Sequence, residues 1–185
     1  MEKLTIRDLQ EADISLIDSY WQSLNEDDLK RMCVDSQKRP SSVEFRARLT
    51  GLLSVAPTDR VADPLIWEVD GTAIGFANLN AFKRPEQADV HLHMFAKNFR
   101  GKGLGRRLFI MSLERYFKRH RLAKIICQPA AANPYPNAMM KALGVAPVKT
   151  YRTIPSGLCY EHEVNRYEFD EQMITTALSA ILITA

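Results

Sequence analysis

The stretch that decides the fold reads Asn98-Phe99-Arg100-Gly101-Lys102-Gly103-Leu104-Gly105. A strand pattern over residues 88–95 precedes it, and a helical pattern follows it to about His120. Glycines let a backbone approach a ligand closely, and the first turn of a helix presents unpaired N–H groups that favour an anion. The order strand, glycine-rich turn and helix therefore predicts a phosphate site, and a pyrophosphate is the ligand that such a turn would hold.

Charge is distributed unevenly along the 185 residues, whose formal net charge is +3. Between Lys97 and Lys124 there are ten Lys or Arg residues and one acid, Glu114, a local balance of +9. The remaining residues include 15 basic and 21 acidic ones, a balance of −6. Such an asymmetry indicates a site for something anionic, either a nucleic acid or a phosphate-bearing cofactor.

Three phosphate-binding motifs are candidates for the glycine-rich turn. The P-loop motif GxxxxGK[ST] is absent. A dinucleotide fingerprint GxGxxG could begin at Gly101, but its third glycine falls on Arg106, and no parallel βαβ unit precedes it. The third pattern, [Gln/Arg]-x-x-Gly-x-[Gly/Ala], is met by Arg100, Gly103 and Gly105. It resembles the acetyl-CoA-binding turn of the GNAT superfamily of N-acetyltransferases.

The order of predicted elements also resembles that family, over roughly residues 3–170. Periodicity, turn residues and capping patterns predict strands at 4–8, 65–69, 73–80, 88–95, 124–128, 148–154 and 164–169, and helices at 14–24, 29–34, 41–51, 104–120 and 133–143. Residues 25–28 read as a polar break and residues 59–64 as a loop.

The resemblance implies an α/β (α+β) fold with a mixed, mostly antiparallel central sheet of six to seven strands flanked by helices. We expect residues 1–170 to form the acetyltransferase domain and residues 171–185 to form a short helical tail.

The resemblance also implies acetyl-CoA as co-substrate. The backbone around Phe95 to Lys97 would splay from its neighbouring strand and bond the pantetheine arm, and the amides from Arg100 to Gly105 would wrap the pyrophosphate. Asn133 looks like the family's asparagine before the last helix, which often contacts the cofactor. The expected cofactor-binding residues are Phe95, Ala96, Lys97, Arg100, Gly101, Lys102, Gly103, Leu104, Gly105, Arg106 and Asn133.

Two histidines are the candidate catalytic bases. His91 and His93 stand at i and i+2 of the strand that enters the turn, so their side chains share a face. Histidine has an ordinary pKa of about 6.5 and can accept a proton from an amine at neutral pH. The strand position also resembles that where some family members carry a catalytic Glu. The alternative is a pair of core histidines satisfied by hydrogen bonds.

One residue departs from the family pattern. Many members carry a tyrosine four residues before the glycine of the last helix, where it protonates the leaving thiolate. This chain has Met140 at that position. Tyr135 and Tyr151 are near in sequence and could substitute, and we take Tyr151 as the candidate catalytic acid.

These features favour an N-acetyltransferase that moves the acetyl group of acetyl-CoA to the primary amine of a small molecule. The acetyl group would pass directly from one substrate to the other in a ternary complex. Two alternatives use the same cofactor turn: a protein N-terminal acetyltransferase, and a non-catalytic acyl-CoA sensor or subunit. A nucleic-acid-binding module is less favoured, because exposed aromatic residues are not expected between the basic residues of the helix.

The cysteines and the apolar runs bear on metal binding, cellular compartment and membrane association. Cys33, Cys127 and Cys159 are far apart and form no CxxC pair, which favours reduced thiols in the cytoplasm and no metal site. The first residues lack the apolar run of a signal peptide. The tail from Met173 to Ala185 would reach roughly 20 Å as a helix, short of a ~30 Å membrane core. We expect the tail to pack on its own domain or on a second copy, as in a homodimer.

Overall fold

The computed structural model describes residues 2–183, with side chains described as far as Leu178. The sheet has seven strands in the order β1-β2-β3-β4-β5-β7-β6. Helices flank it, so the mixed, mostly antiparallel α/β fold expected from the sequence is confirmed. The chain divides into two compact units, residues 1–9, 57–127 and 168–185, and residues 10–56 and 128–167, and each is described by itself.

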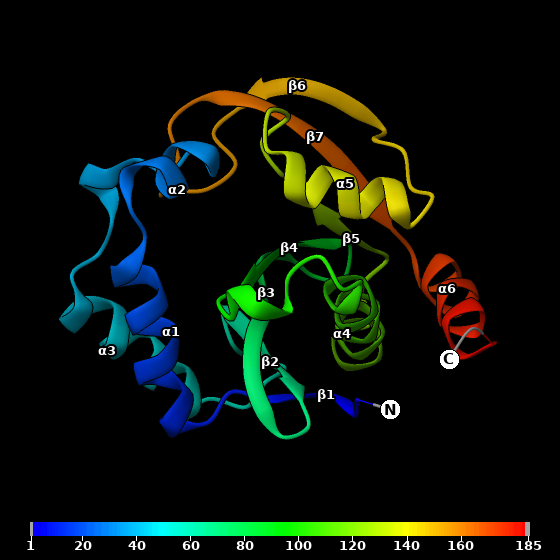
Figure 1. Ribbon diagram of the computed structural model, residues 1–185, viewed down its shortest axis with the longest axis horizontal. Helices are drawn as coiled ribbons and strands as arrows, with labels where there is room; N and C mark the ends of the chain where they lie inside the picture. Colours follow the sequence, from blue (N-terminus) through cyan, green and yellow to red (C-terminus); the bar gives the residue numbers. More distant parts are fainter. Residues whose placement is uncertain (1, 184–185) are drawn as a thin grey trace. The chain divides into compact units, whose positions relative to one another are not determined.

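The first unit holds five strands and the glycine-rich turn. β1 pairs with β2, β2 with β3 and β3 with β4, all antiparallel, and β5 pairs with β4 in parallel. The long helix α4 leaves the turn and packs against β1 and β3 (Figure 1). The bounds are β1 Leu4–Asp8, β2 Ala62–Val69, β3 Thr72–Lys83, β4 Gln87–Met94, β5 Lys124–Cys127 and α4 Leu104–His120.

The register decides which side chains of the first unit face α4. Trp67 on β2 donates from its indole nitrogen to Ser112 Oγ of α4 at 2.8 Å, and both side chains are buried. Alternate residues of a strand point to opposite faces. The residues in register with the α4-facing side of β2 are Gly75, Ala77 and Leu79 on β3, and Met94, Leu92 and Val90 on β4. Their neighbours Phe76, Asn78, His91 and His93 therefore lie on the opposite face.

A buried carboxylate fixes the C-terminal half of α4 to the sheet. Asp63 of β2 has no exposed surface and accepts hydrogen bonds from Arg119 Nη1 at 3.0 and 2.9 Å. His120 Nε2 lies 2.9 Å from the same carboxylate. Arg119 also donates to Asp8 of β1 at 2.6 Å, and the Tyr116 hydroxyl donates to the Asp63 backbone oxygen at 2.9 Å. Hydrogen bonds from three α4 side chains therefore reach β1 and β2.

The second unit consists of helices and an antiparallel strand pair. Helix α1 packs on α3, where Ser42 Oγ donates to Asp18 at 2.5 Å, and β6 pairs with β7. Two short 3-10 helices, η1 (Ser36–Lys38) and η2 (Lys97–Phe99), lie in the second and first unit respectively. The bounds are α1 Glu11–Ser23, α2 Glu26–Arg31, α3 Ser42–Leu53, α5 Pro134–Ala142, β6 Lys149–Thr153 and β7 His162–Phe169.

Two local predictions are wrong. Residues 25–28 are not a break: Asn25 caps α2, its side chain accepting the Asp28 N–H at 2.9 Å. Residues 62–64 are not loop, because β2 begins at Ala62 and stays paired with β3. Proline has no backbone N–H to donate to a neighbouring strand. Pro64 is tolerated because β1 pairs with β2 only from Leu65 onward, so no β1 residue requires a hydrogen bond from position 64.

The tail forms the helix α6 (Glu171–Ile183), as predicted. It packs against α4, and its Ile174 is buried. The side chains of the tail beyond Leu178 lie outside the described residues. Within the described residues, every helix is too short or too polar to cross a membrane.

We predict that replacing Asp63 by Asn lowers the free energy of unfolding by about 3–5 kcal/mol, since the buried cation Arg60 loses a carboxylate partner and Arg119 keeps only its pair with Asp8. Guanidinium unfolding at pH 7 measures the loss. Glu114→Gln is the matched control, because it removes the exposed pair with Lys118 and should cost less than about 1 kcal/mol. Equal effects of the two variants would contradict the structural role of Asp63.

Candidate active site

Strands β4 and β5 are paired over only a short distance. The described ladder joins Gln87, Ala88 and Asp89 to residues 124–126 of β5. Beyond Asp89, β4 continues to Met94 paired with β3 alone, as far as the described residues show. The two parallel strands therefore separate after Asp89, and we call the space along this unpaired edge of β4 the β4–β5 opening.

β4 ends in a bulge directly before the turn. Met94 stands opposite Gly75, so a regular ladder would next pair Phe95 with Ile74. Instead, Ala96 donates its N–H to the Ile74 oxygen at 3.1 Å, which inserts one extra residue. The approach of the strands is close: a side chain on Gly75 would place its Cβ 2.5 Å from the His93 oxygen. Only glycine fits at position 75.

The turn between β4 and α4 presents backbone to open space. Gly101 and Gly103 have φ of +76° and +75°, and a Cβ built on either meets no atom within 4 Å. Gly103 is the N-cap of α4, where the described residues supply neither a capping side chain nor an acid in the first turn. Amides of the turn and the positive end of a 17-residue helix suit an anion, so the segment fits a diphosphate.

The charged side chains of the turn divide into two roles. Arg100 donates from Nε and Nη2 to the Met94 backbone oxygen at 3.1 and 2.5 Å, so its side chain holds the turn against the end of β4. Lys97, Lys102 and Arg106 are exposed and add positive charge around it. Leu104 is buried in the core, which leaves its backbone as the part that a ligand can meet.

His91 and His93 lie on the face of the sheet opposite α4. Both are partly buried, and the His93 ring stacks on Phe76 with centroids 5.0 Å apart. Surrounding protein atoms displace water, which lowers the pKa of His91. Burial, and secondarily the nearness of His91, lower the pKa of His93 to about 3. Both imidazoles are thus neutral near pH 7, and the ordinary pKa expected from the sequence does not hold.

The expected residues of the last helix and strands lie in the second unit. Asn133 caps α5, its side-chain oxygen accepting the Tyr135 N–H at 3.4 Å. The Tyr151 hydroxyl donates to Gln128 Oε1 at 2.5 Å, and Lys149 Nζ lies 4.4 Å from its ring centroid. Met140 is fully buried and serves as core.

Sequence reasoning missed Asn137, the hydrogen-bonding centre of the second unit. Its amide nitrogen donates to the backbone oxygens of Ala130 at 3.0 Å and Asn133 at 2.6 Å. Its oxygen accepts from Asn165 and from the Tyr167 hydroxyl, each at 2.9 Å. An asparagine inside a short helix is an unfavourable choice unless its side chain is bonded, which was the available signal.

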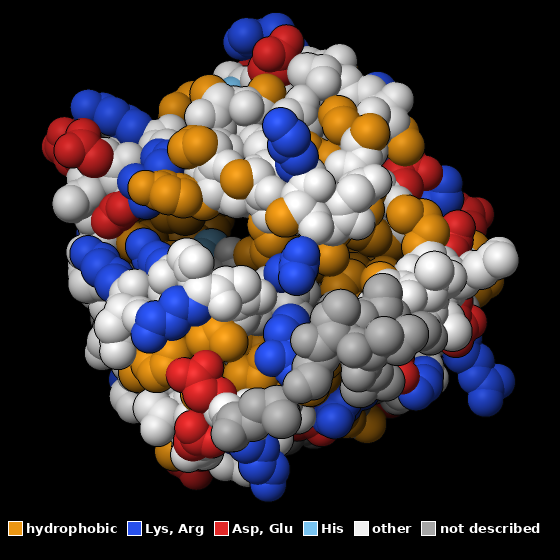
Figure 2. Space-filling model, turned by 45° about the vertical axis from the view of Figure 1, so that its right-hand side comes forward, with side chains coloured by type: hydrophobic (Ala, Val, Ile, Leu, Met, Phe, Trp, Pro, Cys, Tyr) orange, Lys and Arg blue, Asp and Glu red, His pale blue; other side chains and the backbone are white. Residues whose placement is uncertain are grey.

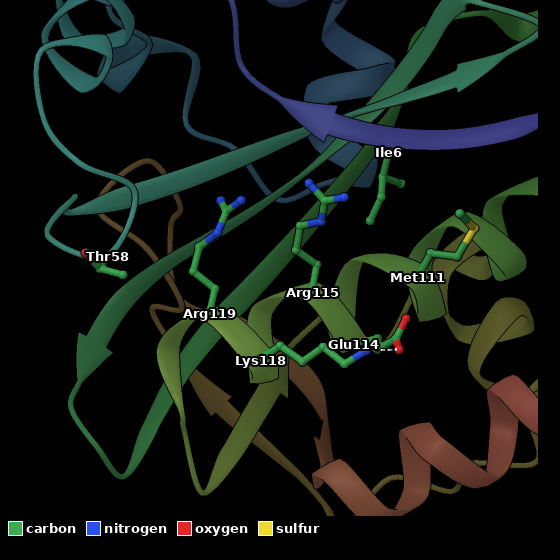
Figure 3. A pocket seen from close by; sticks show the side chains of 7 residues that line it. All are labelled: Ile6, Thr58, Met111, Glu114, Arg115, Lys118 and Arg119. Carbon is green, nitrogen blue, oxygen red and sulfur yellow. Dashed lines mark hydrogen bonds and ion pairs between the residues drawn. The ribbon is translucent and has the colours of Figure 1, made fainter.

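A hollow of about 630 Å³ lies on the α4 side of the first unit (Figure 3). Its cations already have carboxylate partners: Lys118 pairs with Glu114 at 2.5 Å, Arg119 with Asp8 at 2.6 Å, and Arg115 with Asp8 at 3.8 Å. It opens on the opposite face from the two histidines. We therefore do not place the chemistry in this hollow.

The described residues give little support to a metal site or to a nucleic-acid-binding surface. The part of the chain that the structure describes contains no group of three potential metal ligands, and within the Glu161-His162-Glu163 run His162 Nδ1 bonds the Tyr160 oxygen at 2.8 Å. Figure 2 shows acidic side chains lying among the basic ones on the face it draws, which is not the continuous positive surface that nucleic acid favours.

The order of the strands, the separation of β4 from β5 and the glycine turn before α4 define an acetyltransferase fold. The model of the acetyltransferase (GNAT) family matches residues 21–145, and the chain belongs to this family. It is accordingly an acetyltransferase whose co-substrate is acetyl-CoA.

Solved structures share this fold at low sequence identity. Spermidine N-acetyltransferase from Vibrio cholerae, in complex with CoA and spermine, has a TM-score of 0.72 at 18% identity, covering 93% of this chain and 98% of that one. RimL, a ribosomal L7/L12 alpha-N-protein acetyltransferase with coenzyme A, has a TM-score of 0.71 at 16% identity, covering 90% and 93%.

An aminoglycoside acetyltransferase with coenzyme A has a TM-score of 0.70 at 18% identity, covering 94% of this chain and 98% of that one. A comparison with curated proteins by sequence found no match. At these identities the structural likeness shows the fold and leaves the acceptor open.

We predict that Gly103→Ala weakens acetyl-CoA binding about tenfold, because a positive φ costs a side chain about 1–2 kcal/mol and the turn would relax. Titration calorimetry measures the affinity. Gly71→Ala is the matched control: it has the same strain, φ +78°, in the β2–β3 hairpin, and should lose stability but not affinity. Equal binding by the wild type and Gly103→Ala would contradict the assignment of the turn.

Proposed function

We propose that this enzyme transfers acetyl to the primary amine of a small cationic molecule, directly and while both substrates are bound. The observation that carries the proposal is the exposed glycine turn at the end of β4, on a strand whose free edge borders the β4–β5 opening and whose face carries two neutral histidines. Acetyl-CoA, when bound at the turn, supplies an activated thioester carbonyl to the amine.

The reaction requires the acceptor to lose a proton. An alkylammonium of pKa about 10.4 is neutral in roughly one molecule of 10³ to 10⁴ at pH 7. In the balanced reaction, R–NH₃⁺ and the thioester give the acetamide, the CoA thiol and one proton: a C–N bond forms, the C–S bond breaks, and the sulfur keeps the electron pair. A second nitrogen proton goes to that sulfur.

His91 and His93 are the residues that we assign to the net proton. Each neutral imidazole carries one N–H donor and one ring-nitrogen acceptor, so it can accept a proton on one side and release another on the opposite side. A group of pKa about 3 does not retain the proton, which suits His93 to passing it on rather than storing it. Tyr151 is our candidate donor of the proton that the departing sulfur takes.

The acceptor class is argued from charge. Outside residues 97–124 the chain has 15 basic and 21 acidic residues, an excess that favours a cationic acceptor. Among the proteins with the same fold are acetyltransferases for spermidine and for aminoglycosides, both polycationic amines. The three cysteines are unpaired with one another, in keeping with the reducing cytoplasm as the compartment.

A panel of amines tests the function. With acetyl-CoA and a thiol-detecting reagent, we expect steady release of CoA thiol with spermidine or an aminoglycoside and slower release with a peptide N-terminus. Preferred acetylation of the peptide would favour a protein N-terminal acetyltransferase. Tight acetyl-CoA binding with no turnover of any amine would contradict the proposal and favour an acyl-CoA sensor.

The pH profile tests the histidines. We expect kcat/KM to rise with pH as the amine deprotonates, without a bend at the ordinary histidine pKa, because His93 is neutral well below pH 5. His91→Ala and His93→Ala should each lower kcat/KM by about a hundredfold, the low end of general-base effects. Wild-type turnover by both variants across pH 6–9 would remove the histidines from the mechanism.

A further inference from the structure

A row of polar side chains crosses β3 and β4 on the face opposite α4. Asn78 stands opposite His91, Asn80 opposite Asp89, and Phe76 opposite His93. Paired residues of antiparallel strands project to the same side, and successive members of the row are about 7 Å apart along each strand. We call Asn78, Asp89, His91 and His93 the polar row; Asn80 lies next to it and outside the path considered below. The β4 members of the row run beside the β4–β5 opening from the turn to the last β4–β5 pair.

One buried oxygen atom in the row receives no hydrogen bond from the described part of the protein. The side-chain oxygen of Asn78 is buried and has no hydrogen-bond partner among the residues that the structure describes. Leaving a buried acceptor unpaired costs about 1–3 kcal/mol, and buried polar atoms are bonded to protein or to ordered water almost without exception. A buried water normally has two to four polar partners. His91, directly across the strand pair, is the nearest polar residue in register to share such a water.

We infer that Asn78 holds a water that continues the proton path of the transfer reaction from His91 toward Asp89, which makes Asn78 a positioning residue. The inference rests on the proposed function. Asn78 and His91 stand directly opposite on β3 and β4, and Asn78 Oδ1 accepts no hydrogen bond from a described residue, so a single bridging water suits this pair.

The chemistry of the amide oxygen gives the path a direction. An amide oxygen only accepts, so the bound water donates one hydrogen to Asn78 and keeps its lone pairs for the His91 N–H. The water can then donate its second hydrogen toward Asp89, whose carboxylate lies at the end of the row. One proton enters from the ammonium and one leaves toward Asp89 and solvent, with no change of net charge on the row.

A crystal structure that resolves waters tests the site itself, independently of any acceptor. We expect a water within about 3.2 Å of both Asn78 Oδ1 and a His91 ring nitrogen. A protein donor bonded directly to Asn78 Oδ1, or no water at that oxygen, would overturn the inference.

Variants of Asn78 test its part in the reaction. Asn78→Leu preserves size but removes the acceptor; we expect kcat to fall about tenfold, less than the roughly 10²–10⁴-fold that a general acid or base itself contributes, with unchanged acceptor KM and acetyl-CoA affinity. Asn78→Asp keeps an oxygen in place and should restore most of the rate. A solvent deuterium isotope effect on kcat should appear in Asn78→Leu, because proton transfer then limits turnover, and a merely structural role would not produce it.

Asn80→Leu is the matched control, since Asn80 is the next asparagine on the same face of β3 and is partly exposed. Its kcat should stay at the wild-type value. If Asn78→Leu does not fold, Asn78→Ser, whose shorter hydroxyl leaves room for a second water, takes its place with the same expectation of an isotope effect. Wild-type kcat and isotope effect in the folded Asn78 variants would overturn this inference alone, whereas failure of every amine would overturn the proposed function.

Discussion

The parting of two parallel strands is the constraint on which the site depends. β4 and β5 share hydrogen bonds only as far as Asp89, and β4 then continues for five residues held by β3. An unpaired edge inside a sheet is costly unless something else satisfies its backbone. The backbone groups along this edge are therefore open to a ligand, and the edge of β4 that lacks β5 is the one that a co-substrate can occupy.

The contacts around the opening hold the end of β4 and the turn in place without a ligand. Gly75 permits the close approach of β3 to His93, the bulge at Phe95 and Ala96 ends the ladder, and Arg100 holds the Met94 oxygen. Asp63 of β2 accepts hydrogen bonds from Arg119 and so holds the C-terminal half of α4 against the sheet. The turn is therefore supported at both ends, by the end of β4 and by a helix anchored in the core, so little ordering remains to be done when an anion binds.

Local sequence patterns predicted most of the fold, and failed where tertiary pairing decides. The glycine pattern after a strand predicted the turn and α4, because a positive φ and a helix start depend on neighbouring residues. The start of β2 at Ala62 was missed, since pairing with the long β3 overrides Pro64. The pKa of His93 and the unpaired oxygen of Asn78 depend on burial by residues distant in sequence, and so does the hydrogen-bonding of Asn137; no spacing rule contains that information.

The central claim is that backbone amides between residues 101 and 105 bind a diphosphate at the N-terminus of α4. A crystal structure of the complex with acetyl-CoA tests it most directly. The account predicts the pyrophosphate oxygens within hydrogen-bonding distance of those amides and the thioester beside β4 near His93. A pyrophosphate bound elsewhere, for instance among Arg115, Lys118 and Arg119, with the turn unchanged, would contradict it.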